Sequence, residues 1–455
     1  MRYFSRSEAE KKGMLSAIGV ASVDELFLQI PKKHYLKGLL NIPPALSETE
    51  LLNLLQKQSS QNASTDQTIS FLGGGAYDHW IPLLIDDLAG RSEFATCYTP
   101  YQPEVSQGTL QAIFEFQSMI ADLTGMEIVN ASMYDGATAA AEAALMSLRI
   151  LSKGRGKTIL MSRTLHPEYR QICETYLSPL DVNIIEIPWD SNGKSDIGFL
   201  SHQMEELGEE LCSVIIQTPN FFGVVEETEK IANLCRQNGS YCIVAVAEAI
   251  SLGLLPSPGS LGADIVVGEA QSFGNPLQFG GPYVGFFSAR AKDLRQLPGR
   301  LVGATRDTAG SRAFTLTLAT REQHIRREKA TSNICTNQGL CALRTTLYLA
   351  IVGKSGLHQV AYQNFAKTEY AKSKLSEIHG ASLQFSGRTF NEFVIQLPIP
   401  AEEYCAEMTK SNLLAGIPLS RFFPELDQSV LFCCTEMTTK EQIDRWAALS
   451  NEVTG

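Results

Sequence analysis

The sequence predicts an α/β fold in which a large domain, built on a mainly parallel β-sheet, is followed by a smaller C-terminal α+β domain. Two observations carry this prediction. Short apolar runs alternate with helical stretches through the middle of the chain, which is typical of a buried, mostly parallel sheet. After about residue 330 this alternation ends and weaker strand and helix signals follow. The runs cover residues 158–161, 182–187, 213–216, 242–246, 265–267 and 283–287.

The start of the chain is predicted to be a helical arm. Ser7 is a suitable N-cap for an amphipathic helix whose first turn carries Glu8 and Glu10. Residues 57–69 are polar and are expected to form a linker or a surface loop. We therefore expect three parts: the arm over 1–65, the large domain over 66–330 and the small domain over 331–455.

Two helices are predicted ahead of the first apolar run. Apolar residues follow helical spacing from Leu110 to Leu123 and stop at Gly125, a residue suited to a helix end. An alanine-rich helix is predicted to start near Gly136 and to end at residues 153–156. In the small domain we expect a helix near 339–352 and a strand over 392–397.

Composition excludes several classes of function. The 455 residues include 38 Lys+Arg and 49 Asp+Glu, so the formal charge is 38 − 49 = −11. A chain this acidic, with no basic run, is a poor partner for nucleic acid or for an anionic membrane. No stretch approaches the ~20 apolar residues of a membrane helix, and the N-terminus lacks the apolar core of a signal peptide. We therefore expect a soluble, cytoplasmic protein.

The ten cysteines show no CxxC spacing, and several lie in apolar runs. We expect buried, reduced thiols, with Cys97 as the one to watch because its surroundings are polar and aromatic. The seven histidines are scattered without an HExxH pattern, so no metal site is predicted. The glycines at 73–75 do not form a dinucleotide fingerprint. Gly353-Lys354-Ser355 resembles the end of a P-loop, but Tyr348 occupies the position of its first glycine, which favours an interpretation as helix-end chemistry.

Four long motifs remain after these exclusions. They are 71–82 (FLGGGAYDHWIP), 98–108 (YTPYQPEVSQG), 132–139 (SMYDGATA) and 321–338 (REQHIRREKATSNICTNQ). Together they closely resemble the N-terminal half of the glycine decarboxylase P-protein family of the glycine cleavage system. In many bacteria that half is a separate chain, the alpha chain (subunit 1) of an alpha/beta enzyme.

The resemblance implies the fold type I of pyridoxal-phosphate (PLP) enzymes. In this family glycine is decarboxylated with release of carbon dioxide, and the aminomethyl group passes to the lipoyl arm of the H-protein. The implied partners are a beta chain (subunit 2) in an α2β2 tetramer, the H-protein and, indirectly, the T-protein and L-protein. The lipoyl disulfide is the oxidant, so no NAD is needed in this step.

Segment 264–274 (DIVVGEAQSFG) matches the part of the family that carries the cofactor lysine, but it lacks the lysine that a PLP enzyme uses to hold its cofactor. Gln271 stands in its place, and no lysine lies between Lys230 and Lys292. A neutral amide cannot form an imine. The resemblance therefore implies that subunit 2 holds PLP covalently and that this chain does not.

Candidate site residues follow from the same motifs. Tyr98, Thr99, Tyr101 and Gln102 offer two phenols, a hydroxyl and an amide beside stiffening prolines. The resemblance implies that each subunit lends residues to its neighbour's site, so we expect this loop to reach the partner's site. The alternative is an aromatic loop that only packs an interface.

Four further groups are candidates. Gly136, Ala137 and Thr138 open a helix, as a vestigial phosphate site or simply as a capped helix. His166 follows a strand and either mimics a ring-stacking histidine or is an ordinary loop residue; Glu248 receives no role. Arg321, Arg326, Arg327 and Lys329 form a basic cluster that faces acidic groups on subunit 2, faces the H-protein, or pairs locally with Glu322 and Glu328. A weaker hypothesis places Arg300, Arg306 and Arg312 at the mouth of the site.

Two rival functions stay open. The chain could be a catalytically inert scaffold that only stabilises the beta chain, or a free-standing PLP enzyme that uses another lysine. The lysine gap argues strongly against the second.

Overall fold

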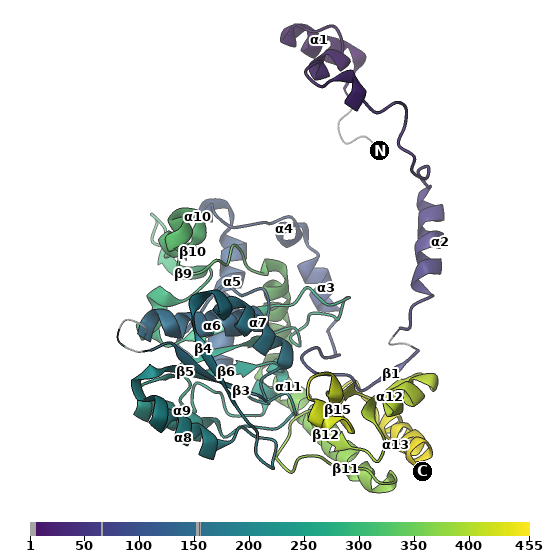
Figure 1. Ribbon diagram of the computed structural model, residues 1–455. Helices are drawn as coiled ribbons and strands as arrows, with labels where there is room; N and C mark the ends of the chain where they lie inside the picture. Colours follow the sequence, from purple (N-terminus) through teal and green to yellow (C-terminus); the bar gives the residue numbers. More distant parts are fainter. Residues whose placement is uncertain (1–5, 65–66, 152–153, 155) are drawn as a thin grey trace. The chain divides into compact units, whose positions relative to one another are not determined.

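The computed structural model describes residues 6–64, 67–151, 154 and 156–455. It divides into two compact units, Met1–Ala63 and Ser64–Gly455. The first unit is helical as predicted, with α1 (Glu8–Ile18), the short 3-10 helices η1 (Asp24–Phe27) and η2 (Lys32–His34), and α2 (Glu48–Ser59) (Figure 1). Ser7 and Ser47 each form a capping box with a glutamate three residues later. Helix α2 extends into the polar stretch that we expected to be a linker.

The second unit is built around a seven-stranded sheet with the order β2-β8-β7-β6-β5-β3-β4. All neighbours from β4 to β7 pair in parallel, whereas β8 runs antiparallel to both β7 and β2. Each of the six apolar runs overlaps one strand, so the prediction of a mainly parallel sheet is confirmed. The strands are β2 (Ile128–Val129), β3 (Thr158–Ser162), β4 (Asn183–Ile187), β5 (Leu211–Gln217), β6 (Tyr241–Val246), β7 (Ile265–Glu269) and β8 (Gly285–Ala289).

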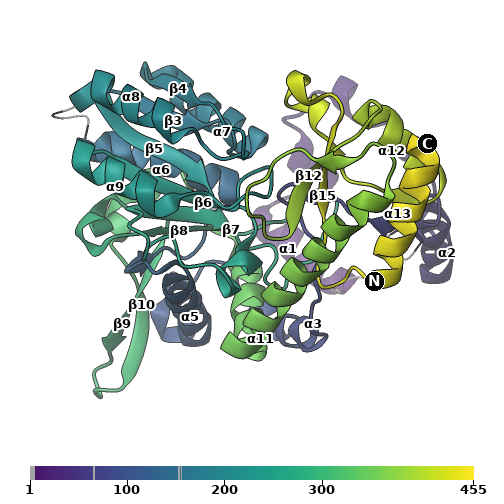
Figure 2. The ribbon, with the colours of Figure 1, turned by 90° about the horizontal axis from the view of Figure 1, so that it is seen from below.

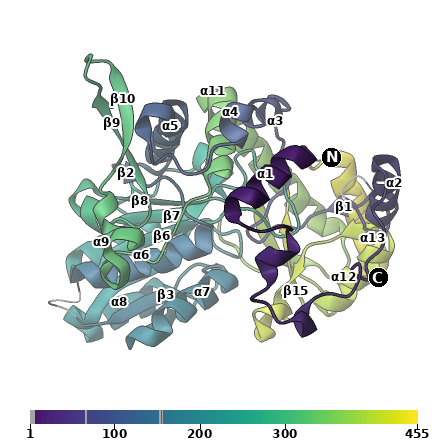
Figure 3. The ribbon, with the colours of Figure 1, turned by 90° about the horizontal axis from the view of Figure 1, so that it is seen from above.

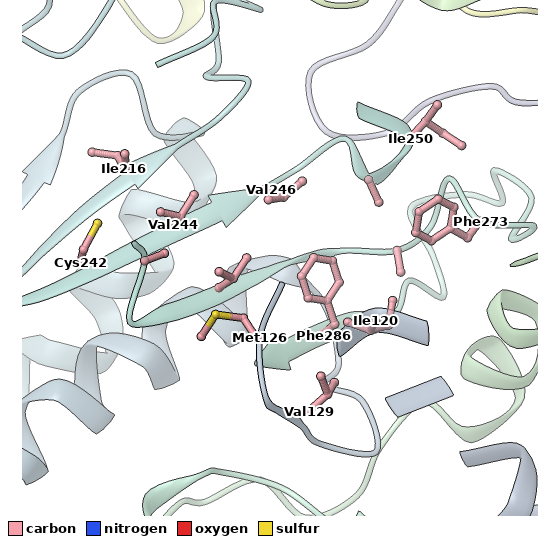
Figure 4. Packing of buried hydrophobic residues seen from close by; sticks show 14 of the residues in the cluster. Ile120, Met126, Val129, Ile216, Cys242, Val244, Val246, Ile250, Phe273 and Phe286 are labelled. Carbon is pink, nitrogen blue, oxygen red and sulfur yellow. The ribbon is translucent and has the colours of Figure 1, made fainter. Parts of the chain in front are cut away.

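Two buried clusters cover the two faces of this sheet. Alternate residues of β6 divide between them, because successive side chains of a strand point to opposite faces: Cys242, Val244 and Val246 join one cluster (Figure 4), and Ile243 and Ala245 join the other. Helices α5 (Gln107–Thr124), α8 (Ile197–Leu207) and α9 (Thr228–Asn238) contribute to the first cluster; α6 (Gly136–Leu151) and α7 (Pro167–Leu177) contribute to the second.

A smaller antiparallel sheet with the order β11-β12-β15-β14 forms the C-terminal part. Its core also takes in Phe71, because β1 (Ile69–Ser70) pairs with β13 (Leu413–Leu414). The domain boundaries at 65/66 and 330/331 stay predictions, and residues 69–71 belong with the C-terminal core. The other elements here are β11 (Ser382–Leu383), β12 (Glu392–Gln396), α12 (Ala401–Lys410), β14 (Ile417–Pro418), β15 (Ser429–Cys433) and α13 (Lys440–Thr454) (Figure 2).

Helix α11 (Gly339–Ser373) is longer than the predicted 339–352 stretch. It continues past Gly353, whose φ of 63° and ψ of 178° interrupt the helical path, so glycine is the residue suited to this break. Strands β9 (Leu301–Arg306) and β10 (Arg312–Thr317) form a hairpin that projects beside α5 (Figures 2 and 3). Shorter helices are α3 (Leu84–Ala89), α4 (Ser92–Ala95) and α10 (Gln323–Arg326), with 3-10 turns including η3 (Pro103–Val105), η6 (Ala249–Gly253), η7 (Ala291–Gln296), η8 (Ala319–Arg321) and η9 (Arg327–Lys329). Within the described ranges, no helix combines the length and apolar character needed to cross a membrane.

Candidate functional site

Gln271 follows strand β7 and is only 2% exposed. Its amide Nε2 donates to the carbonyl oxygens of Tyr77 (3.2 Å) and Asn275 (2.7 Å), and its Oε1 accepts from the Tyr77 N–H (3.1 Å). The side chain at the expected lysine position therefore clamps the backbone of the 71–82 motif. Both ends of the amide are used in this clamp.

The N-terminus of α6 is capped by carboxylates of this chain. Gly136 N–H donates to Glu269 (3.0 Å), and Thr138 N–H donates to Asp135 (2.7 Å). Burial raises the pKa of Glu269 to about 7, although the backbone N–H groups that it accepts lower it in part. Gly136, Ala137 and Thr138 thus open a capped helix whose dipole already faces acidic side chains.

Gly136 is required at this position by close packing. A Cβ built on it would lie 2.1 Å from the hydroxyl oxygen of Tyr169. The glycine therefore lets Tyr169 approach the start of the helix, which narrows the space in which an external phosphate would sit.

His166 is the N-cap of α7. Its Nδ1 accepts from the Glu168 N–H (3.1 Å), so its Nε2 carries the proton and donates to the Gly74 carbonyl at 2.7 Å. The Phe221 ring lies edge-on at 4.9 Å. Burial lowers the pKa of His166, which keeps the ring neutral. His166 therefore fastens the glycine-rich segment at Gly74, whereas Gln271 holds it at Tyr77.

A buried ionic cluster that sequence reasoning missed fastens the same motif at His79. Its ring nitrogens lie 2.9 Å from Glu248, after β6, and 2.8 Å from Glu436, after β15. Burial by itself lowers the pKa of His79, but the two carboxylates outweigh burial and raise the pKa to about 10. Glu248, to which we had given no role, therefore pairs with a histidinium. The only sequence signal was that His79 lies inside a long motif.

Glu392 on β12 completes this arrangement. It accepts from the hydroxyl of Tyr77 (2.8 Å) and from the Gly74 N–H (2.6 Å). Burial raises the pKa of Glu392 to about 7. The 71–82 motif is thus tied to the large sheet through Gln271 and His166 and to the small sheet through Glu392.

The four residues of the predicted contact loop differ in exposure. Tyr98 is 90% exposed and Tyr101 57%, Gln102 is exposed, and Thr99 is half-buried. A pocket of about 260 Å³ lies beside Tyr98 and Thr99 and is lined mainly by apolar side chains of α4, α5 and the start of α11. Cys97 also lines it; this thiol is exposed and donates to the Glu93 carbonyl at 3.0 Å.

Arg300 joins this loop to the motif at 321–338. Its guanidinium donates to Tyr101 Oη (3.1 Å) and Thr99 Oγ1 (3.4 Å), and to Thr336 Oγ1 (3.0 Å) and Asn337 Oδ1 (3.2 Å). The side chain is only 5% exposed. Arg300 is therefore a buried side chain that holds the Tyr98–Gln102 loop and the 321–338 motif in position relative to each other. Arg306 and Arg312 face each other across the hairpin, about 20 Å of strand away from Arg300 at 3.3 Å per residue.

The residues of the predicted basic cluster have different surroundings in the structure. Arg321 donates to the carbonyls of Leu297 and Gly299, while Arg326 and Arg327 are exposed. Among the residues that the structure describes, neither Glu322 nor Glu328 forms an ion pair with Arg321, Arg326, Arg327 or Lys329; Glu322 instead lies 3.7 Å from Arg300. The local pairing that we considered from helical spacing is absent from this part of the chain.

Comparisons with known proteins agree with this architecture. The family model "Glycine cleavage system P-protein" matches residues 1–449. A Desulfitobacterium hafniense protein named "Probable glycine dehydrogenase (decarboxylating) subunit 1" is 48% identical over 100% of both chains. The Bacillus pumilus protein of the same name is 47% identical over 97% of each. A crystal structure of glycine decarboxylase (P-protein) of the glycine cleavage system, in inhibitor-bound form, superposes with a TM-score of 0.90, at 39% identity and full coverage of both chains.

More distant structures define the class of fold. A NifS-like protein from Rickettsia africae has a TM-score of 0.63 at 12% identity and covers 85% of this chain. A sphingosine-1-phosphate lyase from Burkholderia pseudomallei has a TM-score of 0.66 at 13% identity and covers 93%. The fold is therefore that of the PLP-dependent transferases of fold type I. Within that class, the chain belongs to the glycine cleavage system P-protein family.

The residues of this chain do not fit a PLP of its own at the usual place. An amide stands where the Schiff-base lysine would be, and carboxylates cap the helix that would receive the phosphate. His166 and Glu248 are both engaged by the 71–82 motif.

Proposed function

We propose that this chain is the alpha subunit, subunit 1, of glycine dehydrogenase (decarboxylating) and works only together with a PLP-bearing subunit 2. The observation that carries the proposal is Gln271, fully hydrogen-bonded to Tyr77 and Asn275 where the family resemblance expects a lysine. The name "subunit 1" of its relatives supports a second subunit as partner.

In this proposal the beta chain holds PLP covalently and the two chains form an α2β2 tetramer. The complex decarboxylates glycine, releases carbon dioxide and transfers the aminomethyl group to the lipoyl arm of the H-protein. The T-protein and L-protein act on the later steps. We place the complex in the cytoplasm, where the ten free thiols stay reduced.

The contribution of this chain would come from the Tyr98–Gln102 loop. Tyr98 and Tyr101 are exposed and Arg300 holds Thr99 and Tyr101, so the loop is both available and ordered. Phenol, hydroxyl and amide groups orient a small substrate without forming an ion pair with its carboxylate. That is suitable for a decarboxylation, because the carboxylate must lose its charge.

The second candidate is a scaffold that stabilises the beta chain and adds nothing to its site. The state of the usual cofactor position favours it, since Glu269 already accepts from the Gly136 N–H that a phosphate would need, and Gln271 is engaged with the Tyr77 backbone. The two candidates differ in whether the exposed loop contacts the partner's substrate.

Borohydride trapping tests the proposal. PLP is added to this chain, to subunit 2 and to the mixture, followed by borohydride reduction and peptide mapping. We expect label on the partner alone, and glycine decarboxylation only in the mixture. A labelled lysine on this chain by itself would contradict the proposal and revive the free-standing enzyme.

A further inference from the structure

A cationic pocket of about 360 Å³ lies outside the site described above. Its lining includes five basic side chains, and no carboxylate occurs among the lining residues that the structure describes. This is unusual in a chain with a formal charge of −11. We name it the basic pocket; its cations are Arg149, Arg295, Arg321, Arg326 and Lys329.

Separate short elements bring these cations together. Arg149 comes from the last turn of α6, Arg295 from η7, and Arg321, Arg326 and Lys329 from the ends of η8, α10 and η9. Five elements that end at one pocket place positive charge there at an electrostatic cost, because like charges repel.

Two of the guanidinium groups are held in place by the backbone. Arg149 donates to the Gln296 carbonyl at 3.2 Å, and Arg321 donates to the Gly299 carbonyl at 2.8 Å and to that of Leu297. The Nε atoms of Arg149 and Arg321 are buried, and neither has a hydrogen-bond partner in the described residues. The guanidinium groups of Arg149 and Arg321 are thus fixed in position, and each keeps an Nε–H donor without a partner in the described residues.

The charge of the basic pocket is only weakly compensated. Glu142 lies 3.9 Å from Arg149, and it also accepts from Ser332. Within the described ranges, Arg295, Arg326 and Lys329 form no ion pair with a carboxylate. Burial lowers the pKa of Arg149 and of Arg321, so an anion that entered would offset a cost that the fold already carries.

We infer that the basic pocket binds a small multivalent oxyanion of the phosphate class, as free phosphate or as a phosphate ester. Planar guanidinium forks match the oxygen atoms of a phosphate group in pairs, and the lysine adds a mobile point charge. A single partner carboxylate would neutralise less of this charge than a dianion. The inference is independent of the proposed function, since the pocket shares no residue with the Tyr98–Gln102 loop.

The test is calorimetric titration of the full chain with inorganic phosphate, and separately with glycerol 3-phosphate, at constant ionic strength set with sodium chloride. We expect one saturable site with a dissociation constant of about 1 mM or below. Tighter binding of the ester would identify an organic ligand, and equal or weaker binding would identify phosphate itself. The absence of a saturable site for either probe would overturn the inference.

Matched variants test whether the phosphate binds in the basic pocket. Arg326→Gln with Lys329→Gln removes two exposed cations of the basic pocket, and Lys354→Gln with Arg388→Gln removes two exposed cations elsewhere. The first pair should weaken binding by about tenfold or more, and the second should leave it unchanged. Equal weakening in both pairs would mean unspecific attraction and would overturn the inference.

Two further measurements guard against misfolding and against a different occupant. Arg295→Gln changes an exposed cation on another element and should also weaken binding, with an unchanged melting temperature. Addition of subunit 2 should leave phosphate binding in place. Stoichiometric displacement of phosphate by subunit 2 would assign the pocket to the partner's acidic groups and overturn the small-ligand inference.

Discussion

Gln271 and Tyr77 are joined by a pair of hydrogen bonds, 3.1 Å from the Tyr77 N–H to the amide oxygen and 3.2 Å from the amide nitrogen to the Tyr77 carbonyl. The two residues lie 194 positions apart in the sequence. A side-chain amide can satisfy a backbone N–H and a backbone C=O at the same time, whereas a lysine ammonium can only donate. The substitution that removes the Schiff base is therefore also the one that seats the 71–82 motif.

The first prediction concerns the stability of this clamp. Gln271→Ala leaves the buried N–H and C=O of Tyr77 without partners, and we expect the free energy of unfolding to fall by about 2–4 kcal/mol. Urea unfolding followed by tryptophan fluorescence measures the loss. Gln278→Ala, at an exposed position, is the matched control and should be neutral. Equal stability of the two variants would show that the clamp contributes nothing.

The second prediction is that Gln271→Lys does not create a PLP enzyme. The carboxylates of Glu269 and Asp135 still cap α6, and they would repel a phosphate. Borohydride reduction in the presence of PLP should leave the introduced side chain of the Gln271→Lys variant unlabelled, as peptide mapping would show. Stoichiometric labelling at this position would show that the lysine alone separates the two kinds of subunit.

The third prediction is a pH dependence set by His79. Its pKa is raised from 6.5 to about 10 in the folded chain, so between these values the folded state binds a proton that the unfolded state does not. The stabilisation that His79 contributes is then complete below about pH 6.5. It falls by about 1.4 kcal/mol per pH unit as the pH rises toward 10. Unfolding at a series of pH values from about 7.5 to 8.5 measures the total slope. Unfolded thiols also titrate near pH 8.5, so the contribution of His79 is the difference between the slope of the unaltered chain and that of a His79 variant.

His79→Gln provides the comparison. At pH 7 it leaves the buried carboxylates of Glu248 and Glu436 without their cation, a change that typically costs about 3–5 kcal/mol. In this variant the slope between pH 7.5 and 8.5 should be smaller by about 1.4 kcal/mol per pH unit, and the slope from the unfolded thiols should remain. His358→Gln, which alters a histidine outside the cluster, should keep the slope of the unaltered chain. An unchanged slope in His79→Gln would assign the pH dependence to another group.

The fourth prediction concerns Arg300 as a positioning residue. Arg300→Lys keeps the charge but loses the planar fork that reaches Thr99, Tyr101 and the 321–338 motif. We expect a drop in kcat of the assembled complex of about tenfold to a hundredfold, because small misplacements at a site are costly. Faster chymotryptic cleavage after Tyr98 in the isolated chain would report the same loosening without any activity. Arg306→Lys on the hairpin should change neither readout.

The sequence was sufficient to predict the main sheet. Each buried strand is a short run of β-branched and apolar residues, and this local pattern is visible without knowledge of neighbours. The loss of the lysine at Gln271 was equally local. The contact that Gln271 makes with the backbone of Tyr77 could not be predicted, because the periodicity of a sequence does not show which loops lie together in the fold.

His79 shows this limit most clearly. Its two carboxylates lie 169 and 357 positions away, on loops after strands of different sheets. Arg300 has the same character, since its partners lie about 200 positions before it and 35 to 37 after it. Burial and charge bring such groups together only after the topology is formed. The long second half of α11 escaped prediction for a local reason, because Gly353 suggested a helix end.

The last prediction separates an active-site contributor from a scaffold through Tyr98. This side chain is 90% exposed, and its hydroxyl has no hydrogen-bond partner among the described residues, so Tyr98→Phe should leave the stability of the isolated chain within about 0.5 kcal/mol. Tyr101→Phe differs, because its hydroxyl accepts from Arg300. If the Tyr98 hydroxyl contacts the substrate in the partner's site, glycine decarboxylation by the Tyr98→Phe complex falls by about tenfold or more, while assembly measured by gel filtration is unchanged. Full turnover in the Tyr98→Phe, Tyr101→Phe double variant would favour the scaffold, because a phenyl ring packs an interface as well as a phenol but cannot orient a substrate.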